Sequence, residues 1–149
     1  MRHHTILVAG VPVGQGNMKA YSVGGKSRVT HKNGTQLDTW RRTITDAVHR
    51  QLGEEIELMT GPLWISAAFR LPRPKKIPKE NKGMPINTRS GDLDHYLRAI
   101  GDAITGILID DDARIVHVKD LTKVYANEKT QPGVVFTVGE VGCQQGEQG

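Results

Sequence analysis

The sequence predicts an α+β fold, with a single mixed β-sheet and two main helices packed on it. Two segments repeat apolar residues every three or four positions, which is the period of an amphipathic helix. Several short runs rich in Val, Ile and Phe lie between Gly and Pro residues, as expected of strands. The chain has 149 residues, 37% hydrophobic and 24% charged, which fits one domain. We expect this domain to span residues 1–141 and the polar tail over 142–149 to be disordered.

The first part of the chain predicts a strand over residues 4–13, a basic connection and a helix. Residues 14–34 are rich in Gly and in basic side chains, so they predict a long loop or an irregular hairpin. Their G-x-G lacks the third glycine and the following helix of a dinucleotide-binding motif. Residues 35–52 predict an amphipathic helix that ends near Gly53, with Trp40 either in the core or at a subunit contact. The polar face of this helix carries Arg41, Arg42 and Arg50.

The rest of the chain predicts the remaining strands and the second helix. Apolar residues three and four apart predict a helix from Leu93 to about Thr105, with Gly106 as its stop signal. Residues 72–91 contain four prolines and six basic residues and too few apolar groups to pack, so they predict a mobile surface loop. Strands are expected over residues 61–71, 114–118 and 133–141, with 122–126 as a further candidate.

Composition and charge limit the classes of protein that fit this chain. No window approaches the ~20 apolar residues of a membrane helix, and the N-terminus lacks the features of a signal peptide. Cys143 is the single cysteine and cannot form an internal disulfide, so we expect a cytoplasmic protein. Residues 1–91 hold 15 Lys or Arg against 6 acids, whereas residues 92–149 hold 5 against 10. This asymmetry fits a broad basic face for phosphates around a compact acidic site.

The basic loop over residues 72–91 has two interpretations. It is either a solvated linker or an arm that contacts DNA, and its position directly before the acidic stretch favours the arm. The cations that would meet phosphates are Arg73, Lys75, Lys76, Lys79 and Lys82.

Acids concentrate after this loop, beginning with Asp92 and Asp94 at the start of the second predicted helix. Carboxylates are favoured there as caps and by the helix dipole. Arg98 and Asp102 follow Asp94 at intervals of four residues, on one helical face. Capping and a surface ion-pair ladder would therefore explain these residues without any function.

The run from Asp110 to Asp112 is harder to explain in this way. Three adjacent like charges imply either a stabilising cation or extensive exposure. Mg²⁺ binds through one or two carboxylates and takes further ligands from water and phosphate. A chain reversal after the second helix would bring Asp112 back toward Asp92 and Asp94.

Other metal sites do not fit the sequence. An EF-hand needs a glycine and a glutamate at fixed loop positions, which neither acidic cluster has. The six histidines lack zinc-ligand spacing, and the cysteine has no partner. His95 and His117 lie near the acids, and we assign each a surface or structural role in preference to a place behind the metal ligands.

The segment GDLDHYLRAIGDAITGILIDDDARIVHV, over residues 91–118, resembles the signature of RusA-type Holliday junction resolvases. These are small homodimeric endonucleases of phages and bacteria, whose signature joins D-[LI]-D-N-x-x-K, D-A-[IL] and D-D-[AS]-x-[IV]. Outside this segment the similarity is weaker and lies in the order of the elements. The resemblance implies a RusA-like endonuclease domain over residues 1–141 and a phage or prophage origin.

The resemblance also implies roles for the acids. Asp92, Asp94 and Asp112 match the catalytic residues that bind Mg²⁺. Asp111 matches the acid before the last of these, which makes it a further candidate ligand, and Asp102 matches the acid inside the helix.

Two positions differ from the family signature, one further position matches a family residue, and one acid is extra. His95 stands where the family has Asn, and Arg98 stands where it has Lys. A catalytic contact to the scissile phosphate would therefore come from the planar guanidinium of Arg98. Lys123 matches a basic, DNA-binding residue on a later strand to within one position, and Asp110 is an extra acid.

The sequence thus predicts an endodeoxyribonuclease that depends on Mg²⁺, with Mn²⁺ as a substitute, and resolves Holliday junctions and related branched DNA. Asp92, Asp94 and Asp112 would hold the cation, and Arg98 would neutralise charge on the phosphoryl oxygens. The resemblance implies a homodimer, whose two-fold axis would match a four-way junction. No membrane partner is expected.

Two alternatives stay open at this point. One is a non-catalytic nucleic-acid-binding module, in which the acids act only as caps and a solvated turn. The other is a nuclease with the same site that prefers flaps or forks. A D-x-D glycosyltransferase fits poorly, because 149 residues leave little room for a nucleotide-sugar domain.

Overall fold

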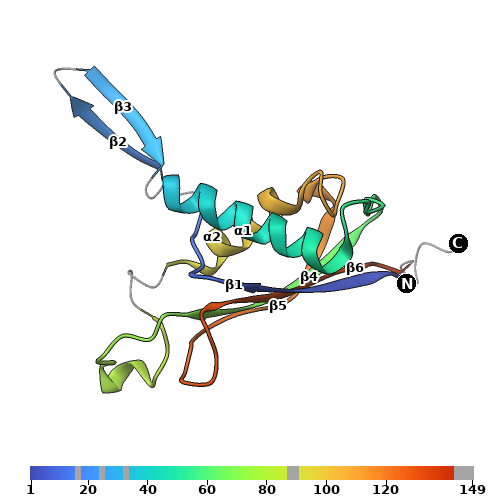
Figure 1. Cartoon of the computed structure of the whole chain (residues 1–149). Coiled ribbons are helices and arrows are strands. Elements are labelled where there is room, and N and C mark those ends of the chain that lie inside the picture. The colour runs from blue at the N-terminus through green and yellow to red at the C-terminus, as the bar shows by residue number, and fades with distance from the viewer. Residues whose placement is uncertain (16–17, 24–25, 32–33, 87–90, 143–149) are drawn as a thin grey trace, which may run out of the picture.

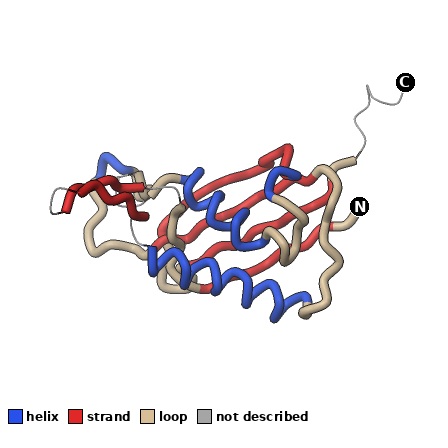
Figure 2. The backbone as a smooth tube through the Cα atoms, turned by 90° about the horizontal axis from the view of Figure 1, so that it is seen from above, coloured by secondary structure: helices blue, strands red, loops and turns tan. Residues whose placement is uncertain are grey.

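The computed structural model describes residues 1–15, 18–23, 26–31, 34–86 and 91–142. Two helices lie together on one face of a four-stranded sheet (Figures 1 and 2). The strand order is β1-β6-β4-β5, with β6 antiparallel to both of its neighbours and β5 parallel to β4. The predicted α+β architecture with a mixed sheet and two main helices is therefore confirmed.

The elements follow the predicted order along the chain. Helix α1 spans Gly34–Leu52 and α2 spans Leu93–Ile104, so both predicted helices are confirmed. Gly53 and Gly106 follow them with φ values of 88° and 82°, a left-handed conformation that stops a helix and that glycine adopts readily. The strands of the main sheet are β1 (His3–Ala9), β4 (Leu63–Leu71), β5 (Ile115–Tyr125) and β6 (Gly133–Glu140), and two short 3₁₀ turns are η1 (Lys79–Asn81) and η3 (Asp112–Arg114).

The prediction of a single sheet was wrong, because the chain forms a second, smaller one. Strands β2 (Met18–Val23) and β3 (Lys26–His31) pair antiparallel with each other, which confirms the hairpin alternative for this segment. Figure 1 shows the hairpin standing away from the main sheet, beyond the start of α1.

The core lies between the two helices and the sheet. Trp40 of α1 is 3% exposed, so it belongs to the core of the chain and not to a subunit contact. Alternate residues of β4 are buried on the face that the helices cover, including Phe69. The ring of Phe69 lies 5.2 Å from the ring of Tyr96 in α2, measured between centroids. This aromatic pair fixes the first turns of α2 against the sheet.

Strand β5 is one continuous strand of 11 residues, where the sequence predicted a short strand over residues 114–118 and a separate candidate over 122–126. The charged residues Lys119 and Asp120 interrupt the apolar pattern and conceal the continuity. They are tolerated because β5 lies at the edge of the sheet and both side chains are exposed. Two register shifts along the pairing with β4 further break the alternation of sides on which the prediction depends.

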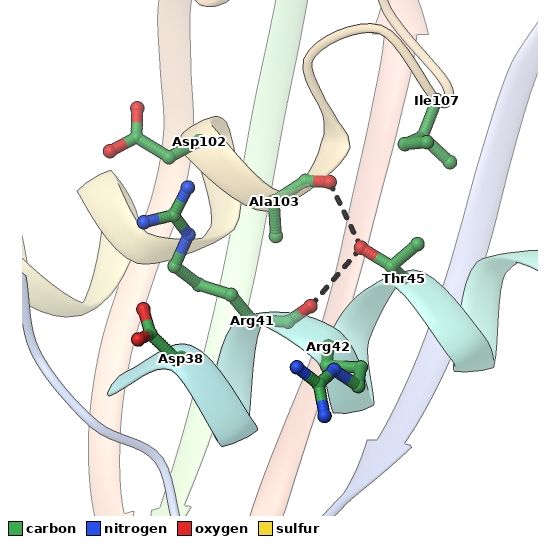
Figure 3. A pocket seen from close by; sticks show the side chains of 7 residues that line it. All are labelled: Asp38, Arg41, Arg42, Thr45, Asp102, Ala103 and Ile107. Carbon is green, nitrogen blue, oxygen red and sulfur yellow. Dashed lines mark hydrogen bonds between the residues drawn. The ribbon is translucent and has the colours of Figure 1, made fainter. Parts of the chain in front are cut away.

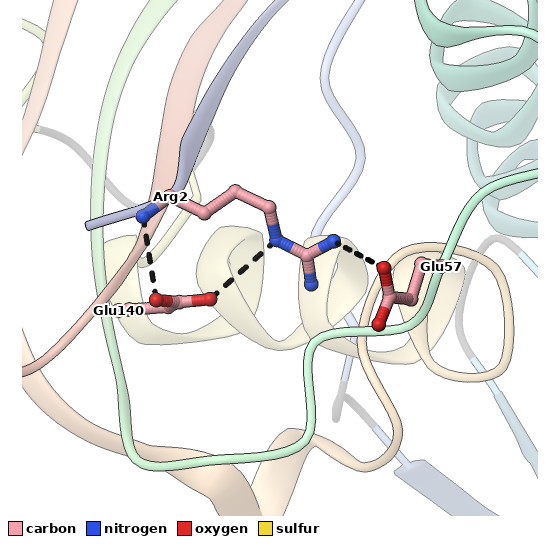
Figure 4. A network of polar contacts seen from close by, with 3 residues as sticks. All are labelled: Arg2, Glu57 and Glu140. Atoms are coloured by element: carbon pink, nitrogen blue, oxygen red, sulfur yellow. Dashed lines mark hydrogen bonds and ion pairs between the residues drawn. The ribbon is translucent and has the colours of Figure 1, made fainter.

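The end of the sheet near the N-terminus is closed by an ion-pair network (Figure 4). The Arg2 guanidinium lies 3.5 Å from a carboxylate oxygen of Glu140 and 3.8 Å from one of Glu57. Figure 1 places the start of α2 at the opposite end of the sheet. Within the described ranges, no helix has the length and hydrophobicity needed to cross a bilayer. The predicted disordered tail, apart from Gly142, lies outside the described residues together with Cys143.

The close approach of β1 and β6 generates a stability prediction at Gly133. A Cβ at this position would collide with the backbone carbonyl oxygen of Val8, which belongs to the neighbouring strand and cannot rotate away. Gly133→Ala is therefore expected to lower the free energy of unfolding by about 1–3 kcal/mol, measured by urea denaturation. Gly61→Ala is the control, because a Cβ there meets no atom within 4 Å. Equal urea midpoints for the two variants would contradict the pairing.

Candidate metal centre

Helix α2 begins at a corner that only glycine fits. Gly91 has a φ of 82°, and a Cβ on it would collide with the hydroxyl of Tyr96. Asp92 follows as the N-cap residue, yet its side chain makes no capping hydrogen bond. Capping therefore does not account for the Asp92 carboxylate, although the helix dipole still favours its charge.

Asp92, Asp94 and His95 form a compact group of ligand atoms, which we call the acid–histidine group. One such atom from each residue lies within 4.8 Å of the other two. His95 Nδ1 lies 3.6 Å from Asp92 Oδ2, and His95 Nε2 lies 4.0 Å from Asp94 Oδ2. The two carboxyl side chains are 69% and 82% exposed, so a hydrated cation can reach them. Carboxylate and imidazole donors at this spacing make a candidate site for a divalent cation.

His95 belongs to this group, whereas the sequence interpretation gave it only a surface or structural role. Its backbone oxygen accepts a hydrogen bond of 2.9 Å from the backbone amide of Gln15. Its side chain is 22% exposed, and a Cβ on Gly14 would approach the His95 Cβ to 3.0 Å. The segment after β1 therefore holds His95 between the two carboxylates. The three-residue interval from Asp92 was the available signal, because it places two helical side chains on one face.

The predicted chain reversal after α2 is present. Residues 105–109 turn back on the helix end, and the amides of Ile107, Leu108 and Ile109 all donate to the backbone oxygen of Ile104. Leu108 and Ile109 are fully buried, which anchors the returning chain in the core. The reversal is short, so it delivers the following acids to the last turn of α2 and not to the first.

The three consecutive aspartates have three different surroundings. Asp110 accepts a hydrogen bond of 2.7 Å from the Arg114 guanidinium, so the extra acid is neutralised locally. Asp111 accepts a hydrogen bond of 2.9 Å from the Ala113 amide and caps η3. Asp112 lies against Gly101 of α2, where a Cβ would come within 3.4 Å of its own Cβ.

Asp111 and Asp112 are adjacent carboxyl groups whose pKa values are shifted in opposite directions. The pKa of Asp112 is raised, first by partial loss of hydration and then by its hydrogen bond with Asp111 and the charge of Asp102. The pKa of Asp111 is lowered, mainly by the hydrogen bond from the Ala113 amide and then by the one with Asp112. The acids around Asp112 therefore disfavour its negative charge, and a cation beside Asp112 would favour it.

Asp112 does not lie in the acid–histidine group, among the residues that the structure describes. From Asp94 to Asp102 the helix advances about 12 Å, at 1.5 Å per residue. The acids of α2 therefore form two centres on one helix, with Asp92 and Asp94 at its start and Asp102 beside Asp112 at its end. The assignment of Asp112 and Asp111 as ligands stays a prediction.

Arg98 lies between the two acidic centres, four residues from Asp94 and from Asp102. Its side chain is exposed and has no ion pair within 4.0 Å to any residue that the structure describes. Asp102 instead accepts a hydrogen bond from the side-chain amide of Gln15. The surface ion-pair ladder considered from the sequence is therefore not formed, and the predicted catalytic role of Arg98 stays a prediction.

Lys123 of β5 reaches the acidic helix start, but it contacts the backbone there. Its ammonium donates a hydrogen bond of 2.6 Å to the carbonyl oxygen of Gly91. Lys123 pairs in register with Phe69 of β4, so the sheet places this ammonium directly beneath the corner that precedes Asp92. The contact holds that corner in place, and the predicted contact of Lys123 with DNA stays a prediction.

The basic loop lies at the same end of the molecule as the start of α2. Figure 1 shows residues 72–86 and the β2–β3 hairpin projecting from this end, away from the N-terminus. All five cations that the sequence assigned to DNA binding are exposed, and η1 shapes the middle of the loop. They are available to a partner at the acidic end of the sheet, and their contact with phosphates stays a prediction. The five are Arg73, Lys75, Lys76, Lys79 and Lys82.

Fold and site together define an α+β protein with a candidate cation centre at the start of a helix that covers a mixed sheet. The chain belongs to the family of the endodeoxyribonuclease RusA, whose model matches residues 9–138. It is thus a member of a family of DNA-cleaving enzymes. It is also similar to the uncharacterized protein YqaN of Bacillus subtilis strain 168, with 27% identity over 141 residues that cover 90% of this chain and 94% of the relative.

The acid–histidine group predicts how single substitutions change cation binding. Asp94→Asn is expected to weaken Mn²⁺ binding by at least about tenfold, because it removes one of two carboxylate ligands. His95→Asn is expected to weaken it less, since both carboxylates remain. The measurement is electron paramagnetic resonance of free Mn²⁺ during titration. Asp120→Asn, an exposed change of the same charge on β5, is the control, and equal affinities of the Asp94 and Asp120 variants would contradict the site.

Proposed function

We propose that this chain is a Mg²⁺-dependent endodeoxyribonuclease that resolves four-way DNA junctions, with Mn²⁺ as a substitute ion. The observation that carries the proposal is the acid–histidine group, whose exposed carboxylates lie within the stretch matched to a nuclease family. Mg²⁺ fits two exposed carboxylates because it retains several waters and takes other ligands from phosphate. The imidazole of His95 is a softer donor, which favours tolerance of Mn²⁺.

In this proposal, different residues of α2 bind the metal ion and neutralise the charge of the phosphate. A bound divalent cation supplies Lewis-acid stabilisation and lowers the pKa of a water molecule. Asp92 and Asp94 hold it at the helix start, where the dipole already favours their negative charge. Arg98 is exposed on the same helix and has no ion pair to a described residue, so its guanidinium is free to neutralise phosphoryl oxygens.

Asp112 and Asp111 are proposed as further ligands through the family signature. The raised pKa of Asp112 supports this role, because the neighbouring acids disfavour its charge and a bound cation would favour it. Asp112 begins η3, ten residues after Asp102, and lies against Gly101 near the end of α2 and not against its first turn. We therefore assign Asp92 and Asp94 the primary binding role and Asp112 a contribution from the other end of the helix.

The charge distribution supports a DNA substrate. The five cations of the basic loop are exposed at the end of the sheet where α2 begins, so a backbone bound there would pass the acid–histidine group. Contacts of this type give affinity and position without reading bases. A junction therefore suits the site better than a specific duplex sequence, and selection among junctions, flaps and forks would depend on shape.

We further propose that the enzyme is a homodimer, as the family resemblance implies. Two symmetric cuts in a four-way junction require two centres related by a two-fold axis. Strand β5 supplies apolar surface for such an association, because it lies at the sheet edge and leaves Val116 65% exposed and Val118 and Val124 42% exposed.

Cleavage of a synthetic four-way junction tests the proposed function. Asp94→Asn is expected to lower the rate in Mg²⁺ by a factor of about a hundred or more, because loss of metal stabilisation costs several kcal/mol in the transition state. Junction binding without metal should change little, since Asp94 is not a phosphate contact. The Asp120→Asn control should cleave normally, and chelation should stop the wild-type reaction. Undiminished cleavage by the Asp94 variant would contradict the proposal.

The same assay separates the alternatives. A non-catalytic binding module would retain salt-sensitive DNA binding and show no metal-dependent nicking by the wild-type chain. A nuclease with a different preference would cleave flaps or forks faster than junctions. Rates on junction, flap, fork and linear duplex under one set of conditions therefore distinguish all three.

The proposed homodimer predicts a particle of twice the chain mass. Sedimentation equilibrium at micromolar concentration should give a mass near two copies of the 16.4 kDa chain, because two-fold cleavage needs a stable pair. A single species of the chain mass at every concentration, together with paired cuts, would contradict the dimer while leaving the nuclease intact.

A further inference from the structure

A polar hollow lies between α1 and α2, away from the acid–histidine group (Figure 3). Its volume is about 430 Å³. Arg41 and Arg42 enter it from α1, and Asp102 enters it from α2. Figure 3 shows the Arg41 guanidinium directed toward α2, between the carboxyl groups of Asp38 and Asp102. The complete lining is Asp38, Arg41, Arg42, Thr45, Asp102, Ala103 and Ile107.

The two helices are fixed to each other at the floor of this hollow. The Thr45 hydroxyl lies 3.1 Å from the carbonyl oxygen of Arg41 and 3.2 Å from that of Ala103, so it links α1 to α2. Ala103 is buried, and the core residue Ile44 beside Thr45 is fully buried. The side chains on the rim therefore project from a rigid base, which reduces the entropy lost when a ligand orders them.

The arginines of the hollow are not committed to partners in the structure. Neither Arg41 nor Arg42 forms an ion pair within 4.0 Å to a residue in the described ranges, although two carboxylates line the same hollow. Arg41 is half-buried and Arg42 is exposed. A guanidinium offers several donors in one plane and matches phosphate oxygens in a bidentate manner. Two adjacent cations with unused donors are the chemistry that a phosphodiester requires.

We propose that Arg41 binds one backbone phosphate of the DNA strand that the enzyme cleaves, outside the reacting phosphate, and that Arg42 at the next position of α1 adds its charge to this site. This inference rests on the proposed function, because it takes DNA as the ligand. Asp38 and Asp102 balance the charge of the arginines, so free inorganic phosphate should bind poorly. A phosphate of the bound DNA strand is already held beside the hollow by the other contacts of that strand. It therefore loses little further entropy when it binds the arginines.

The length of α2 gives the position of that phosphate relative to the cut. Asp102 lies at the rim of the hollow and eight residues after Asp94, which corresponds to about 12 Å along the helix. Along a duplex arm whose axis follows α2, each strand advances 3.4 Å per nucleotide, so this distance spans roughly three or four nucleotides. The phosphate bound by the arginine pair should therefore lie about that far from the scissile bond.

The first test measures junction binding without metal as a function of salt. The double variant Arg41→Gln and Arg42→Gln should bind the junction about tenfold more weakly, as expected for loss of a hydrogen-bonded charge. The slope of log affinity against log salt should fall by about 0.9, the value for one phosphate contact. Arg50→Gln is the matched control, because Arg50 lies on the same helix, is exposed and does not line the hollow. Urea midpoints of all variants verify folding.

The second test uses the unmodified protein and does not depend on how the variants fold. Single methylphosphonate substitutions, which remove one backbone charge each, are placed from one to six nucleotides on either side of the cut. A substitution about three or four nucleotides away on one side should weaken wild-type binding about tenfold and leave the double variant unaffected. A wild-type profile with no sensitive position at that distance would overturn the inference.

The outcomes separate this inference from the proposed function. If the wild-type chain binds and cleaves the junction while the double variant matches Arg50→Gln in affinity and salt slope, the arginine pair is not a phosphate site. If the wild-type chain shows neither DNA binding nor metal-dependent cleavage, the proposed function itself fails. Reduced affinity with an unchanged salt slope would also overturn the inference, because it indicates an indirect effect on structure.

Discussion

The structure depends on one electrostatic constraint at the start of α2. Asp92 and Asp94 lie on either side of His95, and their ion-pair contacts within the described ranges are with that histidine alone. The two like charges repel each other, and a cation bound between them would reduce this repulsion. The chain has 20 Lys and Arg against 16 acids, yet no Lys or Arg in the part of the chain that the structure describes lies within 4.0 Å of either carboxylate. The site therefore favours a cation from outside the chain.

The rest of the fold holds the acid–histidine group in place. The Phe69–Tyr96 ring contact fixes the first turns of α2 on the sheet, and Lys123 of β5 holds the carbonyl of Gly91. The backbone amide of Gln15 donates a hydrogen bond to the backbone oxygen of His95 from the other side. Contacts from three separate segments thus converge on one helical turn and fix the positions of its ligand atoms.

Local patterns predicted most of the fold, and long-range geometry explains what they missed. The apolar spacing of α1 and the glycines after both helices located the helices well, because these signals act within a few residues. Strand β5 was divided in two because Lys119 and Asp120 are acceptable only at a sheet edge, which a single sequence does not reveal. The β2–β3 hairpin was one of two predicted alternatives, whereas its separation from the main sheet depends on long-range packing that local patterns do not report.

The candidate site shows the same division. Asp92 and Asp94 were identified because they match the family signature, whereas His95 was undervalued because its position depends on packing against Gly14. The place of Asp112 depends on how far a short reversal carries the chain, and spacing alone does not determine that.

The most direct test of the metal centre is anomalous diffraction from a crystal soaked in Mn²⁺. The account predicts a peak between the carboxylates of Asp92 and Asp94, and a crystal with no peak there at saturating Mn²⁺ would contradict it.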